Sequence, residues 1–416
     1  MEKLALYGGN KVKTTPYGMG ERYGEEELAS LKSALSQNTL FYVSGASKKN
    51  KEVVEKMTKM YGVPYAVACS SGTAAVHVAL GALGLTAGDE VITTPITDMG
   101  TIIGILAQNA IPVFADVDPH SYNIDPVSIE KCITEKTKII IAVHLAGNPC
   151  DMDAIMDIAR RHNLKVVEDC AQAHLAEYKG RLVGTIGDVG CFSFNEFKQL
   201  SAGDGGMVIM KDEELFYRAH RFADKNYNRF GPEMRKIPFL APNYRMNELT
   251  AAVISAQLDK GKDICEKYHV YGEGLTNGIK NIAGISPIKV LPGCRSTHLW
   301  YYYRIDTDFL GVDVETYVKA LCAEGILAFK GYIPECIYEY DMFKNLEGYL
   351  GTNCPFKCPY YGRKIEYKKG IAPVAEEVLQ TGVRLLVNDF YTEKDLDETV
   401  RAIRKVTEYF AENNKR

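Results

Sequence analysis

A lysine, Lys198, lies between two apolar segments typical of buried strands, residues 189–194 and 206–210. The residues between these segments are mostly polar or glycine, so a short loop would present the lysine at the edge of a sheet. Burial lowers the pKa of a lysine and makes its amine nucleophilic, which allows a Schiff base with an aldehyde. From this segment alone, an ordinary surface lysine in a hairpin loop is the alternative.

A carboxylate occupies a comparable position upstream. Asp169 follows the apolar run 164–167, at the carboxyl end of a predicted buried strand. Open α/β sheets bind their ligands at that edge, where a carboxylate could pair with a pyridinium nitrogen. Capping of a following helix is the alternative role for this aspartate.

A possible anion site follows the strand that ends near residue 68. Gly72 and Thr73 begin a segment of good helix formers. Free backbone N–H groups and the helix dipole attract anions at such a position. The segment lacks the spaced glycines and the Lys-Ser/Thr ending of a P-loop. Phosphate binding and simple helix capping both remain open for it.

A fourth candidate segment precedes another predicted helix. Asn243 and Arg245 lie just before it and could reach an anion. They could equally cap the helix and pair with Glu248.

These motifs together resemble the DegT/DnrJ/EryC1/StrS family of pyridoxal-phosphate sugar aminotransferases, which have fold type I. The resemblance covers nearly the whole chain. It is carried by Ser-Gly-Thr-Ala-Ala at 71–75, Glu-Asp-Cys-Ala-Gln-Ala-His at 168–174, and Phe-Ser-Phe…Lys…Gly-Asp-Gly-Gly at 192–206. Segments 143–153 and 354–361 are similar to the branch that aminates keto-cyclitols and keto-sugars.

The resemblance implies a role for each matching residue. Lys198 would hold pyridoxal 5′-phosphate as a Schiff base and act as general acid and base, and Asp169 would bind the ring nitrogen. The other cofactor contacts that it implies are Gly72, Thr73, Gln172, Ser193 and, across the interface of a homodimer with shared active sites, Asn243.

Asp98 is a departure from the family pattern. Many members have an aromatic residue near this position, stacked on the cofactor ring. A carboxylate over a cationic ring is electrostatically favourable but provides less stacking area, so Asp98 is a candidate cofactor contact. Capping of the apolar helix that follows is the alternative.

Candidate substrate contacts are less specific. His144 lies in a segment that resembles the keto-cyclitol branch, while Tyr332 and Tyr361 lie in predicted loops where they could line a sugar-sized pocket or simply pack. The aromatic stretch 300–303 is predicted to be a strand in the core. No metal site is expected, because the cysteines near residues 336–358 lack tight pairs and a fourth ligand.

The activity implied by the resemblance is transfer of an amino group from glutamate or glutamine to a keto-sugar or keto-cyclitol, in amino-sugar or aminocyclitol biosynthesis. Two alternatives stay open. One is a pyridoxal-phosphate lyase or dehydratase of the same family, and the other is a non-catalytic regulator that binds the cofactor. Lys198 argues against those dehydratases in which histidine replaces the lysine.

Composition is consistent with a cytoplasmic enzyme that binds small molecules. The 416 residues include 49 basic and 53 acidic side chains, so no excess charge favours a nucleic-acid or membrane partner. No stretch approaches the roughly 20 apolar residues of a membrane span. Many of the eleven cysteines lie in apolar segments, which favours reduced thiols.

The alternation of strands and helices predicts an α/β protein. We expect a large cofactor domain at 1–260, with an N-terminal arm and a mostly parallel seven-stranded sheet flanked by helices, and a smaller α+β domain at 261–416. The last strand should return antiparallel after the lysine loop. A helical run at 252–280, interrupted near 260–261, should link the domains, and a capping box at 392–395 should begin the closing helix. The large-sheet strands are predicted at 63–68, 90–94, 111–115, 138–144, 164–168, 189–194 and 206–210.

Overall fold

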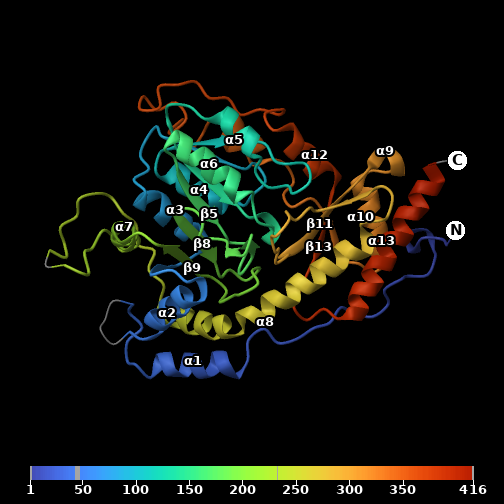
Figure 1. Ribbon diagram of the computed structural model, residues 1–416, viewed down its shortest axis with the longest axis horizontal. Helices are drawn as coiled ribbons and strands as arrows, with labels where there is room; N and C mark the ends of the chain where they lie inside the picture. The colour runs from blue at the N-terminus through green and yellow to red at the C-terminus, as the bar shows by residue number, and fades with distance from the viewer. Residues whose placement is uncertain (1, 43–46, 232, 415–416) are drawn as a thin grey trace.

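The computed structural model describes residues 2–42, 47–231 and 233–414 (Figure 1). A large sheet with helices on both sides forms one part of the molecule, and a smaller sheet with its own helices forms the other. The long helix α8 (Glu248–Ile279) runs along both parts.

The large sheet has seven strands in the order β1-β9-β8-β5-β4-β2-β3. Only β9 runs antiparallel to its neighbours, β1 and β8, while the other pairs are parallel. The predicted fold class and the antiparallel return of the last strand are therefore confirmed. The strands are β1 (Tyr65–Cys69), β2 (Glu90–Thr93), β3 (Ile111–Phe114), β4 (Thr137–Val143), β5 (Lys165–Asp169), β8 (Val189–Ser193) and β9 (Gly206–Met210).

Both faces of this sheet are apolar and covered by helices, as expected for a mostly parallel sheet. Val167 packs into one hydrophobic cluster with helices α3, α4 and α7, whereas its neighbour Val166 packs into a second cluster with α2, α5, α6 and α8. The strands are continuous apolar runs because successive side chains enter different cores. These helices are α2 (Lys49–Tyr61), α3 (Gly72–Ala82), α4 (Met99–Ala107), α5 (Pro126–Cys132), α6 (Met152–His162) and α7 (Glu213–Ala223).

The smaller sheet has four antiparallel strands in the order β10-β11-β13-β12. The predicted strand at 300–303 is present, and its tyrosines are buried in the core. The strands are β10 (Ile285–Pro287), β11 (Trp300–Ile305), β12 (Ala328–Lys330) and β13 (Gly382–Leu386). The accompanying helices are α9 (Thr307–Leu310), α10 (Val314–Ala323), α11 (Asp341–Lys344), α12 (Pro373–Thr381) and α13 (Glu393–Asn414).

The remaining elements are short or peripheral. Helix α1 (Glu25–Leu35) packs against α8, and β6 (Glu177–Tyr178) pairs with β7 (Arg181–Leu182). Three 3₁₀ turns are η1 (Ala5–Tyr7), η2 (Leu145–Gly147) and η3 (Ile337–Glu339).

Helix α8 differs from its prediction because it is continuous through residues 260–261. Gly261 is buried, and a Cβ added there would lie 3.1 Å from Cδ1 of Leu200. The glycine therefore gives close packing instead of a break in the helix. Asn247 caps the helix through its side chain. Because α8 crosses the predicted boundary, the division into 1–260 and 261–416 stays a prediction.

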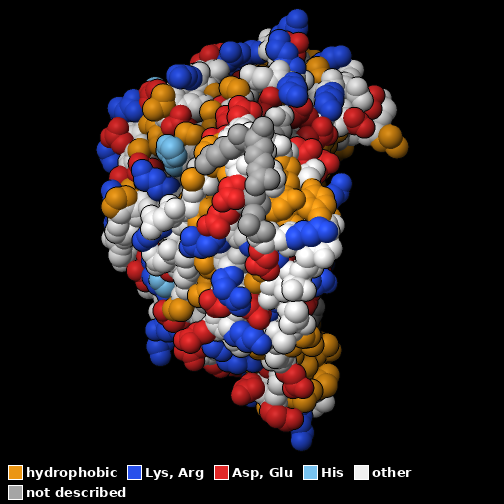
Figure 2. Space-filling view, turned by 90° about the vertical axis from the view of Figure 1, so that its right-hand side faces the viewer, with side chains coloured by type: hydrophobic (Ala, Val, Ile, Leu, Met, Phe, Trp, Pro, Cys, Tyr) orange, Lys and Arg blue, Asp and Glu red, His pale blue; other side chains and the backbone are white. Residues whose placement is uncertain are grey.

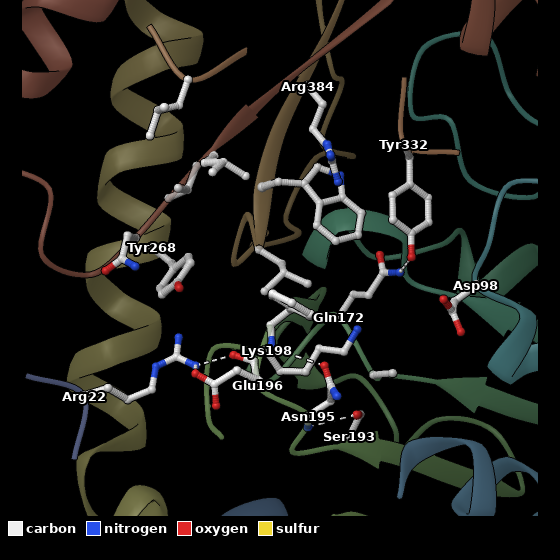
Figure 3. A pocket seen from close by; sticks show the side chains of 18 of the residues that line it. Arg22, Asp98, Gln172, Ser193, Asn195, Glu196, Lys198, Tyr268, Tyr332 and Arg384 are labelled. Atoms are coloured by element: carbon white, nitrogen blue, oxygen red, sulfur yellow. Dashed lines mark hydrogen bonds and ion pairs between the residues drawn. The ribbon is translucent and has the colours of Figure 1, made fainter. Parts of the chain in front are cut away.

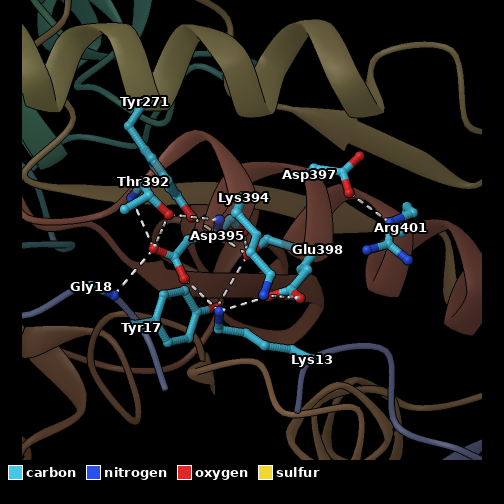
Figure 4. Close-up of polar contacts among 11 residues, drawn as sticks. Lys13, Tyr17, Gly18, Tyr271, Thr392, Lys394, Asp395, Asp397, Glu398 and Arg401 are labelled. Atoms are coloured by element: carbon cyan, nitrogen blue, oxygen red, sulfur yellow. Dashed lines mark hydrogen bonds and ion pairs between the residues drawn. The ribbon is translucent and has the colours of Figure 1, made fainter. Parts of the chain in front are cut away.

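A buried ionic cluster fixes the N-terminal arm to α13 (Figure 4). Lys13 forms ion pairs with Asp395 and, at 2.9 Å, with Glu398, and its side chain is 1% exposed. The backbone N–H of Gly18 also donates to Asp395. Thr392 and Asp395 exchange the hydrogen bonds of the predicted capping box, which is confirmed. The carboxylate of Asp395 therefore holds both the start of α13 and the N-terminal arm.

Replacing Lys13 by methionine is expected to lower the free energy of unfolding by about 3–5 kcal/mol, because two buried carboxylates lose their cation. Burial would raise the pKa of Asp395, but hydrogen bonds from Lys13, Thr392 and Gly18 outweigh it and lower that pKa to about 2. A carboxyl with a folded pKa below its ordinary 3.8 stabilises the fold above that value and loses this contribution as the pH falls toward 2.

Urea unfolding of both proteins at pH 7 and near pH 3 measures this effect. The difference in free energy of unfolding between the wild type and Lys13→Met should be smaller at the lower pH. Lys394→Met is the matched control, because the side chain of Lys394 is 64% exposed and its Nζ lies 3.9 Å from Oε1 of Glu398. Its expected effect is at most about 1 kcal/mol. Equal losses in the two variants would contradict the role of the buried cluster.

The surface carries charges of both signs. On the face shown in Figure 2, basic and acidic side chains are interspersed with hydrophobic ones. None of the helices described is long and apolar enough to cross a membrane.

Candidate active site

A cavity of about 1260 Å³ lies where the carboxyl ends of the large-sheet strands meet the N-terminal arm and the smaller sheet (Figure 3). Residues 15–20 of the arm form part of its wall. Ligands bind at this edge in open α/β sheets, so the cavity is the default candidate for the active site. The predicted site residues that line it are Gly72, Thr73, Asp98, Asp169, Gln172, Ser193, Lys198 and Tyr332.

Lys198 and Asp169 both line this cavity, at the carboxyl ends of the adjacent strands β8 and β5. Lys198 lies in the loop between β8 and β9, and Asp169 is the last residue of β5. Burial lowers the pKa of the Lys198 amine, although the charges of Asp169 and Asp98 oppose that shift. A lysine in such a place is more readily neutral, and hence nucleophilic, than one in water.

The carboxylate of Asp169 is oriented by its neighbours. Thr101 Oγ1 donates to one carboxylate oxygen at 2.7 Å, and the backbone N–H of Ala171 donates to the other at 3.1 Å. Burial raises the pKa of Asp169, while these two hydrogen bonds and the charge of Lys198 oppose the shift. No α-helix begins directly after Asp169, so the helix-capping alternative does not apply. Its buried charge would instead be compensated by a cation in the cavity.

Gln172 bridges the two parts of the molecule. Its side-chain oxygen accepts from the backbone N–H of Ala146 at 2.7 Å, and its side-chain nitrogen donates to the Tyr332 hydroxyl at 3.3 Å. Figure 3 shows Gln172 and Tyr332 pointing toward each other across the cavity. The predicted substrate residue Tyr332 therefore lies beside a predicted cofactor residue.

Gly72 makes a close approach between α3 and β8 possible. A Cβ added to Gly72 would lie 2.6 Å from Cβ and 2.9 Å from Oγ of Ser193. Ser71 caps α3 by accepting from the backbone N–H of Ala74. The free N–H groups at this helix start and the Ser193 hydroxyl thus form a compact cradle suited to a phosphate.

Replacing Gly72 by alanine is expected to weaken the binding of pyridoxal 5′-phosphate about 10-fold or more, because overpacking would push α3 away from Ser193. Equilibrium dialysis of the cofactor against the cofactor-free protein measures this. Gly24→Ala is the control, since its added Cβ would approach only the end of the Glu26 side chain. Wild-type affinity in the Gly72 variant would contradict the proposed cradle.

Asp98 serves as a helix cap and also lines the cavity. Its side chain accepts from the backbone N–H of Gly100 at 2.7 Å and begins α4. The capping alternative is therefore confirmed, and the contact with the cofactor ring stays a prediction.

Three predicted residues do not line the cavity. His144 is fully buried beneath it, where Nε2 contacts Glu168 at 3.2 Å and Nδ1 accepts from the N–H of Cys150 at 3.0 Å. Tyr361 is also buried and donates to Glu90 at 2.8 Å. Both side chains have hydrogen-bond partners inside the protein, and their contact with a substrate stays a prediction.

Asn243 is the third of these residues. Its side-chain oxygen accepts from the backbone N–H of Arg245 at 3.4 Å, and it lies outside the lining of the cavity. Arg245 pairs with buried Asp224 rather than with Glu248, so that predicted pairing is wrong. Asn247, not Asn243, caps α8. The role of Asn243 toward a second subunit stays a prediction.

Sequence analysis missed three cavity residues from the smaller sheet, Trp300, Arg384 and Leu386, of which the first two carry polar groups. Trp300 begins β11 and stacks on Tyr332, with ring centroids 4.5 Å apart. Arg384 lies in the middle of the otherwise apolar strand β13. A lone arginine within an apolar strand was the available signal for this second residue, because such a charge needs a partner.

The sheet order, the lysine loop and the cavity match fold type I, and the family match described next identifies an aminotransferase, an enzyme that transfers amino groups. The sequence profile described as the DegT/DnrJ/EryC1/StrS aminotransferase family matches residues 21–367. The chain belongs to this family.

Similar proteins that are named as aminotransferases support the same class of enzyme. A Micromonospora echinospora protein with the provisional name L-glutamine:3-amino-2,3-dideoxy-scyllo-inosose aminotransferase is 36% identical, over 91% of this chain and 90% of that protein. The L-glutamine:2-deoxy-scyllo-inosose aminotransferase of Streptomyces lividus is 34% identical, over 80% of this chain and 82% of its own length. Among solved structures, an aminotransferase from Psychrobacter cryohalolentis matches with a TM-score of 0.84 and 29% identity, over 95% of this chain and 100% of that one.

Proposed function

We propose that this enzyme uses pyridoxal 5′-phosphate to move an amino group from glutamine or glutamate to the ketone of a cyclitol or sugar. The observation that carries the proposal is the convergence of Lys198, Asp169 and the Gly72–Ser193 cradle on one cavity. Each feature matches one part of the cofactor: the aldehyde, the pyridine nitrogen and the phosphate.

The residues present fit this cofactor. Gly72 lets the start of α3 lie against Ser193, which brings the helix N-terminus and the Ser193 hydroxyl together in the cavity wall, where they could bind an anion. Asp169 would hold the ring nitrogen, because a buried carboxylate is stabilised by a cationic partner. The cofactor, when bound, supplies an electron sink for the carbon that loses or gains a proton.

The chain's own groups would position the reactants and move the protons. Lys198, with a lowered pKa, is suited to take a proton from the donor carbon and to return one to the new amine-bearing carbon. Thr101 keeps the Asp169 carboxylate in one orientation. Residues of the arm and of the smaller sheet form part of the cavity wall, where they would help to position a substrate.

The substrate class follows from the relatives and from the cavity. The two relatives described above have names that give L-glutamine as the donor and an inosose as the acceptor. A cavity of about 1260 Å³ exceeds the few hundred cubic ångströms of a small pocket, and it has space for a cofactor together with a ring-sized substrate. We therefore favour a keto-cyclitol or keto-sugar acceptor in aminocyclitol or amino-sugar biosynthesis.

We also propose a homodimer in which Asn243 reaches the cavity of the second subunit. The segment between α7 and α8 protrudes from the body at the left of Figure 1. Exposed apolar side chains at such a place favour an interface over contact with water. The exposed apolar residues of this segment are Phe230, Met234, Ile237, Phe239 and Leu240.

A cytoplasmic location is part of the same proposal. All eleven cysteines are unpaired thiols, and most of them are buried. This is the pattern of a protein kept in a reducing compartment.

The test is a product assay with glutamine or glutamate and a panel of keto-cyclitols and keto-sugars. Amino transfer predicts one aminated product for each donor molecule consumed. Loss of water or ammonia from the substrate without donor consumption would favour the lyase alternative. Cofactor binding with no turnover of any donor would favour a regulator.

A further inference from the structure

Two histidines and a glutamate meet where α8 passes the loop that precedes β11. His269 and Glu273 lie four residues apart on α8, so they share one face of the helix, while His298 belongs to the loop. One ring nitrogen of each histidine and one carboxylate oxygen lie within 4.8 Å of one another. None of these three residues lines the active-site cavity, although their neighbours Tyr268 and Leu299 do.

The ring of His269 is held with one nitrogen available. Its Nδ1 lies 2.8 Å from the backbone oxygen of Ser296, and because a carbonyl oxygen only accepts, Nδ1 carries the proton. In the neutral ring Nε2 is then an acceptor, and no residue that the structure describes donates to it. Metal-binding histidines are commonly oriented in this way, by a hydrogen bond from the other ring nitrogen to a backbone carbonyl.

The backbone places His298 directly against α8. Its φ of 36° lies in the left-handed region, which only a few per cent of residues other than glycine adopt. Gly272 makes room for the ring, since a Cβ added there would lie 2.2 Å from Cγ of His298. The side chain of His298 is 2% exposed. A polar ring is therefore fixed inside the protein, beside the helix face that carries the other two residues.

The distance between His298 and Glu273 suits two ligands of one ion. Nε2 of His298 lies 3.2 Å from Oε1 of Glu273, which is the upper limit for a hydrogen bond, the metal-free alternative. Two ligands of a tetrahedral zinc ion lie about 3.3 Å apart, because each bond is about 2.0–2.1 Å long. Glu273 pairs with no lysine or arginine within the described part of the chain, and its side chain is 40% exposed. An ion and a water molecule can therefore reach it from solvent.

We propose that His269, Glu273 and His298 form a binding site for Zn²⁺, with water as the fourth ligand. Two imidazoles and one carboxylate are a ligand set that zinc binds in proteins. Nε2 of His298, which donates to Glu273 without metal, would bind the ion after its proton moves to Nδ1 of the same ring. The ion would join α8 to the loop that leads into the cavity wall at Leu299 and Trp300. The site does not depend on the proposed function.

The test is zinc binding to the full-length protein, without a polyhistidine tag and stripped of metal by a chelator. Calorimetry with zinc chloride should give one site per chain with a Kd of about 1 µM or lower. His269→Gln and Glu273→Gln should each weaken binding at least about 10- to 100-fold, because each removes a ligand. His162→Gln is the matched control and should change nothing, since the exposed pair of His162 with Glu130 is joined by Arg161 instead of a second histidine.

Two further measurements separate this site from a general loss of structure and from zinc on the thiols. Zinc should raise the melting temperature of the wild type and of the control, and of neither site variant. Cobalt in place of zinc should give difference spectra without the thiolate charge-transfer band of a cysteine-bound ion. A wild-type protein that binds no zinc would overturn the inference. So would zinc binding that both site variants keep, or a cobalt spectrum with the thiolate band.

Discussion

Replacing Lys198 by alanine should abolish amino transfer, with a loss in rate of at least about 10⁴-fold, the upper range for an essential general acid–base. The account assigns two tasks to this amine, holding the cofactor and moving the proton, and no other lysine lines the cavity described here. The variant should also lack the visible absorbance of lysine-bound cofactor, measured after reconstitution with pyridoxal 5′-phosphate.

Lys211→Ala provides the control for this loss. Lys211 follows the far end of β9 and donates to the backbone oxygen of Thr185 at the surface. It should keep full activity and the visible absorbance. If the Lys198 variant kept both its activity and the visible absorbance, Lys198 could not be the residue that holds the cofactor.

Replacing Asp169 by asparagine is expected to have the second largest effect, a loss in rate of about 10²–10³-fold, as for removal of one electrostatic contact to the transition state. The change preserves shape and removes the buried charge that would keep the ring nitrogen protonated. With the amide oxygen toward the backbone N–H of Ala171, the amide nitrogen can donate to Thr101 Oγ1, because a hydroxyl accepts as well as donates. We therefore expect the fold to persist while single-turnover rates with glutamine fall.

Asp157→Asn is the matched control, because Asp157 is exposed on α6 and pairs with Arg160 and Arg161. It should leave the single-turnover rate unchanged. A wild-type rate in Asp169→Asn, with a wild-type melting temperature, would show that this carboxylate does not act on the cofactor.

The large sheet could be predicted because each of its strands is a short apolar run followed by a helix or a tight loop. The short lysine loop between β8 and β9 was enough to predict the antiparallel return. The prediction of a break in α8 was wrong because a glycine within a helix can allow close packing, as Gly261 does against Leu200.

The core of the candidate site was visible in the sequence because Asp169 ends one apolar strand and Lys198 lies in the loop that follows another. The opposite wall was not visible, since Trp300 and Arg384 come from the separate sheet of the smaller part. Which side chain of a strand faces a cavity depends on how the two parts pack together. For the same reason, local sequence could not place His144 and Tyr361, which are satisfied by buried carboxylates.

The most direct test of the central claim is the absorbance spectrum of the reconstituted protein during titration with glutamine. The account predicts a visible band that depends on Lys198 and that glutamine converts to the near-ultraviolet band of the aminated cofactor. A keto-cyclitol acceptor should then restore the visible band. A protein that binds no pyridoxal 5′-phosphate, or whose visible band no amino donor changes, would contradict the account.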